Sequence, residues 1–483
     1  MKRLNGMDAM LLYTETPSLH THTLKVAVVH AASYRAEHGS EFTFEVFRRT
    51  VARRLHLLDP LRYQLVDIPW KLHHPMWLQD CPVDLDYHLR RVKVPSPGGR
   101  RELDEVIGQI ASTPLDRSRP LWEFHFAEGM ADDRFALIGK VHHALADGVA
   151  SANLLARLMD LAGSARDEHD DYVPCEPPSK AELLRAAGRD HVQNIAALPV
   201  LMRDAVRGVV RLRRRRRSRR PDAPQDKAKL FKTPSTFLNH VVSPTRTFAT
   251  ATLALAEVKQ TAKQLNVTFN DIVLATAAGG LRELLLRYDG RADRPILASV
   301  PVATDRSPDR ITGNEISGLT VSLPVHIDDP LERVRLTALT TANAKEVHDL
   351  LGPRLQGQAM EYLPPPLTPA LFRWQSKRAA HNRVMNVAIS SVAGPREHGH
   401  IGGARVSEIY SVGVLSAGSA FNMTVWSYVD QVDIAVLSDD QTFDDVHEAT
   451  DAMVHSFNEI RVAAGLTPLT TVDTAMAPAT ADR

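Results

Sequence analysis

The stretch Lys140-Val141-His142-His143-Ala144-Leu145-Ala146-Asp147-Gly148 carries an HHxxxDG motif between two segments of different periodicity. Residues 134–141, before it, form a short apolar run that is typical of a buried strand. Residues 149–161, after it, repeat apolar side chains at steps of three and four, as a helix does. The histidines are therefore predicted at a strand-to-helix junction, where side chains can be presented to a ligand.

This spacing favours proton transfer by a histidine. A histidine four residues ahead of an aspartate can take a proton from a hydroxyl, while the Asp-Gly pair shapes the turn that aims it. A histidine pair with no chemical role is the commonest alternative, and a metal site formed by His143 and Asp147 is another. The metal site requires a helix through the motif, which Gly148 and the preceding strand disfavour, and no further ligands stand nearby. We therefore expect a general base and no metal.

Length and composition bound the architecture. A chain of 483 residues, 44% of them hydrophobic, is expected to form two domains of roughly 200 residues. Cys81 and Cys175 lie far apart and form no CxxC motif, which predicts neither a disulfide framework nor a zinc site and fits a reducing cytoplasm. We expect no signal peptide, and without an uninterrupted run of 18 apolar residues we expect no membrane-spanning segment.

The nearly balanced charge, 58 basic against 57 acidic residues, hides a strongly basic segment. Residues 203–220 contain ten arginines and one acid, Asp204, and an apolar stripe at near-helical spacing precedes them in residues 181–210. Three interpretations stay open: a solvated linker, an amphipathic helix on an anionic membrane, and a nucleic-acid contact. Nucleic acid is the least favoured because no aromatic residues interleave the arginines.

The second half alternates predicted strands and helices. Residues 247–255, 295–302, 317–325, 421–428 and 432–437 are predicted strands. Asn270 and Asp271 precede an apolar-periodic run, so Asn270 is expected to cap a helix. The alternative role for Asn270 is an oxyanion donor that faces the cleft.

The motif resembles the active-site motif of the CoA-dependent acyltransferase superfamily and, more narrowly, that of the bacterial wax ester synthase/acyl-CoA:diacylglycerol acyltransferase family. Similar blocks occur along nearly the whole chain: Leu4, Asp8 and Ala9; Pro120 to Glu123; Leu238-Asn239; Asn270-Asp271; Gly313, Asn314, Ser317, Leu323 and Pro324; Gly394-Pro395; Asn422 to Asp430. The chain departs from the family pattern at Pro301 to Arg306 and Ser391 to Pro395, which leaves substrate preference open.

The resemblance implies an α/β fold with mixed (α+β) sheets, built as two chloramphenicol-acetyltransferase-like domains with a central cleft. The expected divisions are an N-terminal acyltransferase domain in 1–190, a basic amphipathic linker in 191–235, a C-terminal acyltransferase-like domain in 236–466, and a flexible tail in 467–483.

The resemblance also implies an acyl-CoA-dependent O-acyltransferase that esterifies diacylglycerol, long-chain alcohols or both. His143 would be the general base, with His142 supporting it, Asp147 holding the turn and Gly148 allowing close approach. Acyl-CoA would be a co-substrate and no cofactor is expected. We expect a cytoplasmic protein that attaches to the inner face of the plasma membrane or to lipid droplets through residues 203–220. Another alcohol acceptor, a carrier-protein thioester as donor, or a non-catalytic lipid-binding role are the alternatives.

Overall fold

The computed structural model describes residues 1–159, 176–218, 232–380 and 384–469. Cys175, the arginines at 219 and 220, and most of the predicted tail lie outside these ranges. The strands that the sequence predicted in the second half are confirmed, with ends that differ by at most two residues.

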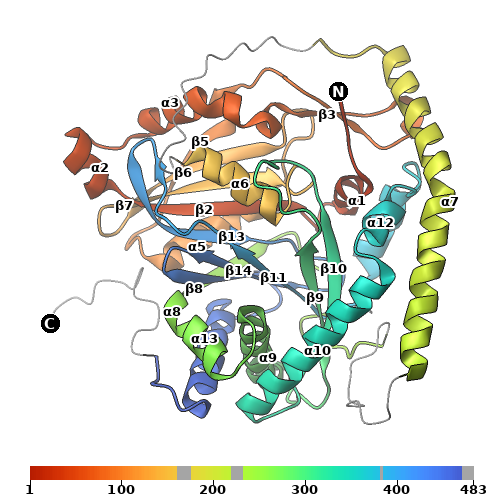
Figure 1. Ribbon diagram of the computed structural model, residues 1–483. Coiled ribbons are helices and arrows are strands. Elements are labelled where there is room, and N and C mark those ends of the chain that lie inside the picture. The colour runs from red at the N-terminus through yellow and green to blue at the C-terminus, as the bar shows by residue number, and fades with distance from the viewer. Residues whose placement is uncertain (160–175, 219–231, 381–383, 470–483) are drawn as a thin grey trace.

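In the described part of the chain, two six-stranded mixed sheets form the two halves of the molecule (Figure 1). The first has the order β12 (His400–Ile401), β13 (Ala404–Val412), β2 (His22–His30), β7 (Arg134–His142), β6 (Trp122–Met130), β5 (Leu89–Lys93). The second has the order β10 (Ile316–Leu323), β9 (Ile296–Ala303), β11 (Val387–Ala393), β14 (Phe421–Tyr428), β15 (Gln431–Asp439), β8 (Arg246–Ala254). A small sheet joins β1 (Lys2–Arg3), β4 (Met76–Leu78) and β3 (Gln64–Val66).

Helices cover both sheets. In the first half they are α1 (Gly6–Thr14), α2 (Ala31–His38), α3 (Phe44–Arg54), α4 (Leu85–His88), α5 (Arg100–Ala111) and α6 (Gly148–Leu158), with short 3-10 turns η1 (Leu55–Leu57), η2 (Asp59–Arg62) and η3 (Pro69–Lys71). In the second half they are α8 (Leu255–Gln264), α9 (Phe269–Tyr288), α10 (Pro330–Leu351), α11 (Leu355–Met360), α12 (Thr368–Arg378) and α13 (His447–Ala463). The apolar faces of α9, α10 and α13 pack on the second sheet and close its core.

The second half of the chain contributes β12 and β13 to the first sheet. β13 comes from the second half of the sequence but pairs antiparallel with β2, from Val406 opposite Val29 to Val412 opposite Leu24. Its side chains join the cores on both faces of the first sheet. The range 1–190 predicted for the N-terminal domain therefore lacks two strands of the first sheet, because β12 and β13 lie within 236–466.

The predicted basic linker begins within a long helix, α7 (Lys180–Ser218), which runs along one side of the molecule (Figure 1). Leu183, Ala186 and Ala187 are buried near its start, and farther along it packs against α10 and α11. At its basic end, Arg215 forms an ion pair with Glu346 of α10. The helical spacing read from residues 181–210 is confirmed, and the helix also crosses the predicted division at residue 190.

Candidate active site

The HHxxxDG motif forms the turn between β7 and α6. β7 ends at His142 and α6 begins at Gly148. The backbone amide of His143 donates to the carbonyl of Thr21, at 2.8 Å, and the amide of Leu145 donates to the carbonyl of His142, at 2.9 Å. The predicted strand-to-helix junction is confirmed, and main-chain hydrogen bonds fix the turn that carries the histidines.

The side chain of His143 meets a residue from the second half of the chain. Its Nδ1 lies 3.0 Å from Oδ1 of Asn314. The Asn314 amide nitrogen Nδ2 donates to the backbone carbonyl of His143 at 2.7 Å and to Oδ1 of Asp8 at 2.8 Å. Burial lowers the pKa of His143 below 6.5, so the neutral imidazole that a general base requires predominates near neutral pH.

The Asp147 side chain holds the turn through three partners. Its Oδ1 accepts the amide of Ala150 at 2.9 Å, which makes it the N-cap of α6. Its Oδ2 accepts the amide of Glu315, at 2.9 Å, and the Arg310 guanidinium forms an ion pair with this buried carboxylate, also at 2.9 Å. Arg310 in turn donates to the carbonyl of Gly313. These contacts join the turn to the start of α6 and to Arg310 and Glu315, and the structural role of Asp147 stays a prediction.

Two glycines allow the second half of the chain to approach the motif. Ala146 and Gly313 form an isolated parallel bridge, in which the Gly313 amide donates to the carbonyl of Leu145 at 2.7 Å. Gly313 has a φ of 81°, in the left-handed region that favours glycine. A Cβ on Gly148 would lie 3.0 Å from a methyl group of Val392 on β11, so this position permits close packing against the second sheet.

His142 is fully buried and points to different partners from His143. Its Nδ1 accepts the amide of Ala144 at 3.1 Å, and its Nε2 lies 3.0 Å from the hydroxyl of Thr21. Since Nδ1 accepts, Nε2 carries the proton and donates. His142 thus stabilises the turn that presents His143. Among the residues that the structure describes, no cluster of three or more His, Cys, Asp or Glu side chains could hold a metal ion.

An apolar cavity lies beside the motif, between the first sheet, α6, α3 and the turns η1 and η2. On the sheet, Thr23 of β2 and the paired Val141 of β7 mark the end next to His143, whereas Ala27 and Leu137 lie four residues farther along their strands. Its other lining residues are Lys25, Phe47, Leu58, Leu61, Phe124, Ile138, Gly139, Ser151, Leu154, Leu155, Leu158 and Ile401. The cavity therefore follows the strands for about 13 Å, at roughly 3.3 Å per residue.

Among the described residues that line this cavity, Lys25 is the one with an ionisable side chain. Burial lowers its pKa to about 8. Its Nζ donates to the hydroxyl of Ser411 at 2.5 Å and lies 4.9 Å from the ring centre of Trp426. The ammonium is thus held at the wall by partners from β13 and β14.

The capping prediction for Asn270 is wrong. The N-cap of α9 is Thr268, whose hydroxyl accepts the amide of Asp271 at 3.2 Å, while the Asp271 carboxylate accepts the amide of Thr268 at 3.0 Å. This reciprocal capping box starts the helix two residues earlier than expected and places Asn270 in its first turn. The oxyanion role of Asn270 stays a prediction.

Sequence reasoning gave no site role to Asp8, Asn314, Arg310 or Lys25. Asp8 and Asn314 belong to blocks that resemble the family pattern, but 306 positions separate them along the chain. No local spacing connects them to the motif. A buried Asp147 would need a cationic partner, but the sequence contains many arginines and does not show which one pairs with it.

Known structures share this fold, and sequence comparison identifies the family. The first condensation domain of the calcium-dependent antibiotic synthetase has the same fold, with a TM-score of 0.56 and 14% identity, and the match covers 97% of this chain and 99% of that one. The model of the wax ester synthase/diacylglycerol acyltransferase catalytic domain matches residues 4–273, and the model of the family's C-terminal domain matches residues 312–461. The chain belongs to this family, and the resemblance read from its motifs is confirmed.

Individual relatives match over most of their lengths. A Mycobacterium tuberculosis H37Rv protein named "Putative diacyglycerol O-acyltransferase" is 54% identical over 480 residues, which is 99% of this chain and 100% of the relative. The O-acyltransferase WSD of Acinetobacter baylyi is 31% identical over 382 residues, 76% of this chain and 79% of that protein. The solved wax ester synthase/diacylglycerol acyltransferase of Marinobacter aquaeolei VT8 superposes with a TM-score of 0.65 at 24% identity, over 96% of this chain and all of that one.

Proposed function

We propose that this protein transfers a long-chain acyl group from acyl-CoA to the hydroxyl of diacylglycerol or of a long-chain alcohol, with His143 as the general base. The observation that carries the mechanism is the hydrogen bond between Nδ1 of His143 and Asn314, which leaves Nε2 for the acceptor hydroxyl. The substrate classes follow from family membership and from the names of the relatives.

The proposed reaction needs no covalent enzyme intermediate because a thioester is already activated. Nε2 of His143 takes the hydroxyl proton as the alcohol oxygen attacks the thioester carbonyl. The new C–O bond forms, the C–S bond breaks, and the imidazolium returns the proton to the departing CoA sulfur. Acyl-CoA is the co-substrate, and the scheme uses no other cofactor.

An assay with both acceptors tests this function. Purified protein is mixed with radiolabelled palmitoyl-CoA and either dioleoylglycerol or hexadecanol, and ester product and free CoA thiol are measured. We expect ester and thiol in equal amounts, and loss of both in His143→Gln. Absence of ester with both acceptors would contradict the proposal, and a palmitoyl thioester on a carrier protein is then the next donor to test.

We assign the acyl chain to the apolar cavity beside the motif. Each buried CH2 group contributes about 0.8 kcal/mol, so every methylene that packs among these apolar side chains strengthens binding of the donor. Ala27→Leu, at the end distant from His143, should lower kcat/KM for palmitoyl-CoA several-fold more than for octanoyl-CoA. Ala136→Leu is the matched control, because Ala136 is equally buried but packs on the opposite face of the sheet. If Ala27→Leu and Ala136→Leu lowered kcat/KM equally for both donors, the cavity would not be the acyl-chain site.

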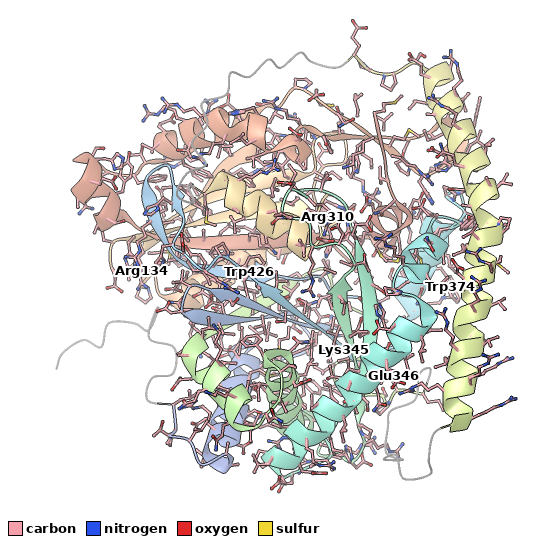
Figure 2. All side chains as sticks on the ribbon, viewed as in Figure 1. Arg134, Arg310, Lys345, Glu346, Trp374 and Trp426 are labelled. Atoms are coloured by element: carbon pink, nitrogen blue, oxygen red, sulfur yellow. The ribbon has the colours of Figure 1, made fainter. Side chains whose placement is uncertain are left out.

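The proposed membrane contact is the exposed side of α7 and its neighbours. Apolar side chains are exposed along the helix at Val192, Ile195, Val200, Met202 and Val206. Trp70 before α7, and Leu367, Leu371 and Trp374 on or next to α12, are also exposed. Figure 2 shows Trp374 on the side of the molecule along which α7 runs. We call this set the apolar face. No helix in the described part of the chain has the length and apolarity needed to cross a bilayer.

The basic end of α7 supplies charge complementary to anionic lipid. Arg213, Arg214 and Arg217 are exposed, whereas Arg215 is engaged by α10. Basic residues near an anionic surface contribute about 1 kcal/mol each. Changing the three exposed arginines to glutamine should weaken binding to vesicles that contain phosphatidylglycerol and leave the weak binding to phosphatidylcholine unchanged.

The matched control changes three arginines elsewhere. Arg49 and Arg53 on α3 and Arg291 after α9 are exposed, and their replacement by glutamine removes the same charge. We expect this control to bind anionic vesicles nearly as well as the parent. Equal losses in both variants would mean that net charge, and not the end of α7, determines binding.

A further inference from the structure

The contacts around His143 define which ring nitrogen carries the proton. Asn314 uses both hydrogens of its side-chain amide, one toward the carboxylate of Asp8 and one toward the backbone carbonyl of His143. Only its carbonyl oxygen is left to face Nδ1 of His143, at 3.0 Å. The flipped amide would set its oxygen against two acceptors, so this orientation is the one that satisfies every group.

We propose that Asn314 and Asp8 are positioning residues that hold His143 in the tautomer with Nδ1 protonated and Nε2 unprotonated. The proposal rests on His143 being the general base, and it adds the element that prepares this base. Because Oδ1 of Asn314 can only accept, Nδ1 of His143 must donate, and the lone pair is confined to Nε2. The same contact stabilises the imidazolium that forms when Nε2 takes the proton.

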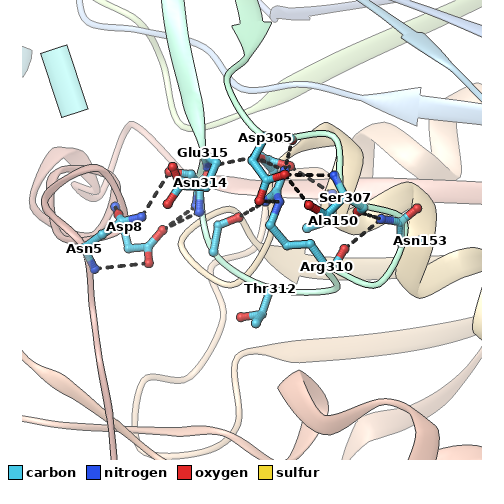
Figure 3. Close-up of polar contacts among 12 residues, drawn as sticks. Asn5, Asp8, Ala150, Asn153, Asp305, Ser307, Arg310, Thr312, Asn314 and Glu315 are labelled. Carbon is cyan, nitrogen blue, oxygen red and sulfur yellow. Dashed lines mark hydrogen bonds and ion pairs between the residues drawn. The ribbon is translucent and has the colours of Figure 1, made fainter. Parts of the chain in front are cut away.

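Asp8 fixes the orientation of Asn314. Its Oδ1 accepts both the backbone amide of Asn314, at 2.9 Å, and the side-chain amide, at 2.8 Å (Figure 3). Asp8 is held in turn at the start of α1, where it forms a capping box with Asn5. Burial raises the pKa of Asp8 to about 7, and the hydrogen bonds from Asn314 and Asn5 favour its charged form. Asp8 of α1 thus orients His143 through the side-chain amide of Asn314.

The decisive measurement is the tautomer in the intact protein. Protein labelled with 15N-histidine is studied by NMR near neutral pH, and the signal of His143 is assigned by its loss in His143→Gln. We expect a protonated Nδ1 and an unprotonated Nε2. A signal with the proton on Nε2 would overturn the proposal, and this test needs no variant at position 8 or 314.

Variants test the consequence for turnover. In Asn314→Leu, we expect kcat to fall about 10- to 100-fold, as for loss of one hydrogen bond to a group that becomes charged in the transition state. KM for palmitoyl-CoA should stay within twofold, and the His143 signal should show a mixture of tautomers. A folded Asn314→Leu protein with parental kcat and an unchanged tautomer would overturn the proposal.

An exchange of the two groups provides rescue. Asn314→Asp places a second carboxylate beside Asp8 and should lower kcat. Combining it with Asp8→Asn restores one amide and one carboxylate, with an acceptor still facing Nδ1, and should recover part of the loss. Absence of any recovery in a folded double variant would count against the contact between the two groups.

The control for general damage is Asn386→Leu. Asn386 is fully buried and its amide is also hydrogen-bonded, to Pro234 and Asn239, within the second half. This variant should lower the melting temperature and leave kcat per folded molecule and the His143 tautomer unchanged. Absence of ester with the parent protein would refute the proposed function, and activity in His143→Gln would refute His143 as the general base. An inactive His143→Gln beside a fully active Asn314→Leu would refute only this inference.

Discussion

The turn around His143 buries polar side chains, whereas the exposed side of α7 leaves large apolar side chains in contact with water. At the turn, Asp147, Asn314 and Asp8 are buried polar groups, and each has hydrogen-bonded partners from distant parts of the chain. Along α7, large apolar side chains such as Ile195, 70% exposed, remain in contact with water. Buried polar groups without partners destabilise a fold, so the turn is fixed in one geometry. Exposed apolar groups cost less and remain available to a lipid surface.

The largest effect is expected at the turn, from His143→Gln. Removal of a general base typically lowers turnover by two to four orders of magnitude. Radiolabelled ester formation measures kcat, and the melting temperature should change little because His143 is only partly buried. His455→Gln, on the exposed surface of α13, is the matched control and should retain parental turnover.

Stability at the turn should depend on the ion pair between Arg310 and Asp147. Arg310→Leu leaves a buried carboxylate unpaired, which typically costs 3–5 kcal/mol, so we expect a large loss in the free energy of unfolding measured with urea. Asp147→Ala should also destabilise the protein, because α6 loses its N-cap. Arg335→Leu breaks the exposed ion pair with Glu332 and should lower the free energy of unfolding far less, because solvent screens that pair. Similar losses in the free energy of unfolding for Arg310→Leu and Arg335→Leu would contradict this prediction.

A smaller effect is expected on the apolar face. Replacing Ile195 and Trp374 together by serine should weaken binding to mixed phosphatidylcholine–phosphatidylglycerol vesicles about tenfold or more, since a fully buried apolar side chain contributes about 1.5–3 kcal/mol. Vesicle flotation measures the binding. Turnover of octanoyl-CoA with a short soluble alcohol should stay unchanged. Undiminished vesicle binding would remove these side chains from the proposed contact.

The smallest effect concerns pH. Because burial lowers the pKa of His143, the neutral base persists on acidification, and half-maximal kcat/KM should occur below pH 6.5. Lys25 and His142 also lower this pKa, while Asp147 raises it. Lys25→Met removes one of the lowering charges and should move the acidic limb of the profile to higher pH. A pH–rate profile measures both, and a parental limb above pH 6.5 would contradict the assignment.

Much of the fold could be predicted from local pattern. The strands of the second half, the strand before the motif and the helix after it follow from apolar periodicity, which records which face is buried. The start of α9 could not be placed correctly, because Thr268, Asn270 and Asp271 are all plausible near a helix N-terminus. Packing and the reciprocal bonds of Thr268 and Asp271 decide between them.

The sequence by itself determined the family, the base candidate His143 and the structural acid Asp147, since these depend on residue types at short spacing. Tertiary structure alone decided that Arg310 pairs with Asp147, that β13 completes the first sheet, and that Asp8 and Asn314 meet at His143. The physical reason is that buried hydrogen bonds and ion pairs need partners within about 3 Å. Partners hundreds of residues apart reach that distance only when the two halves pack together.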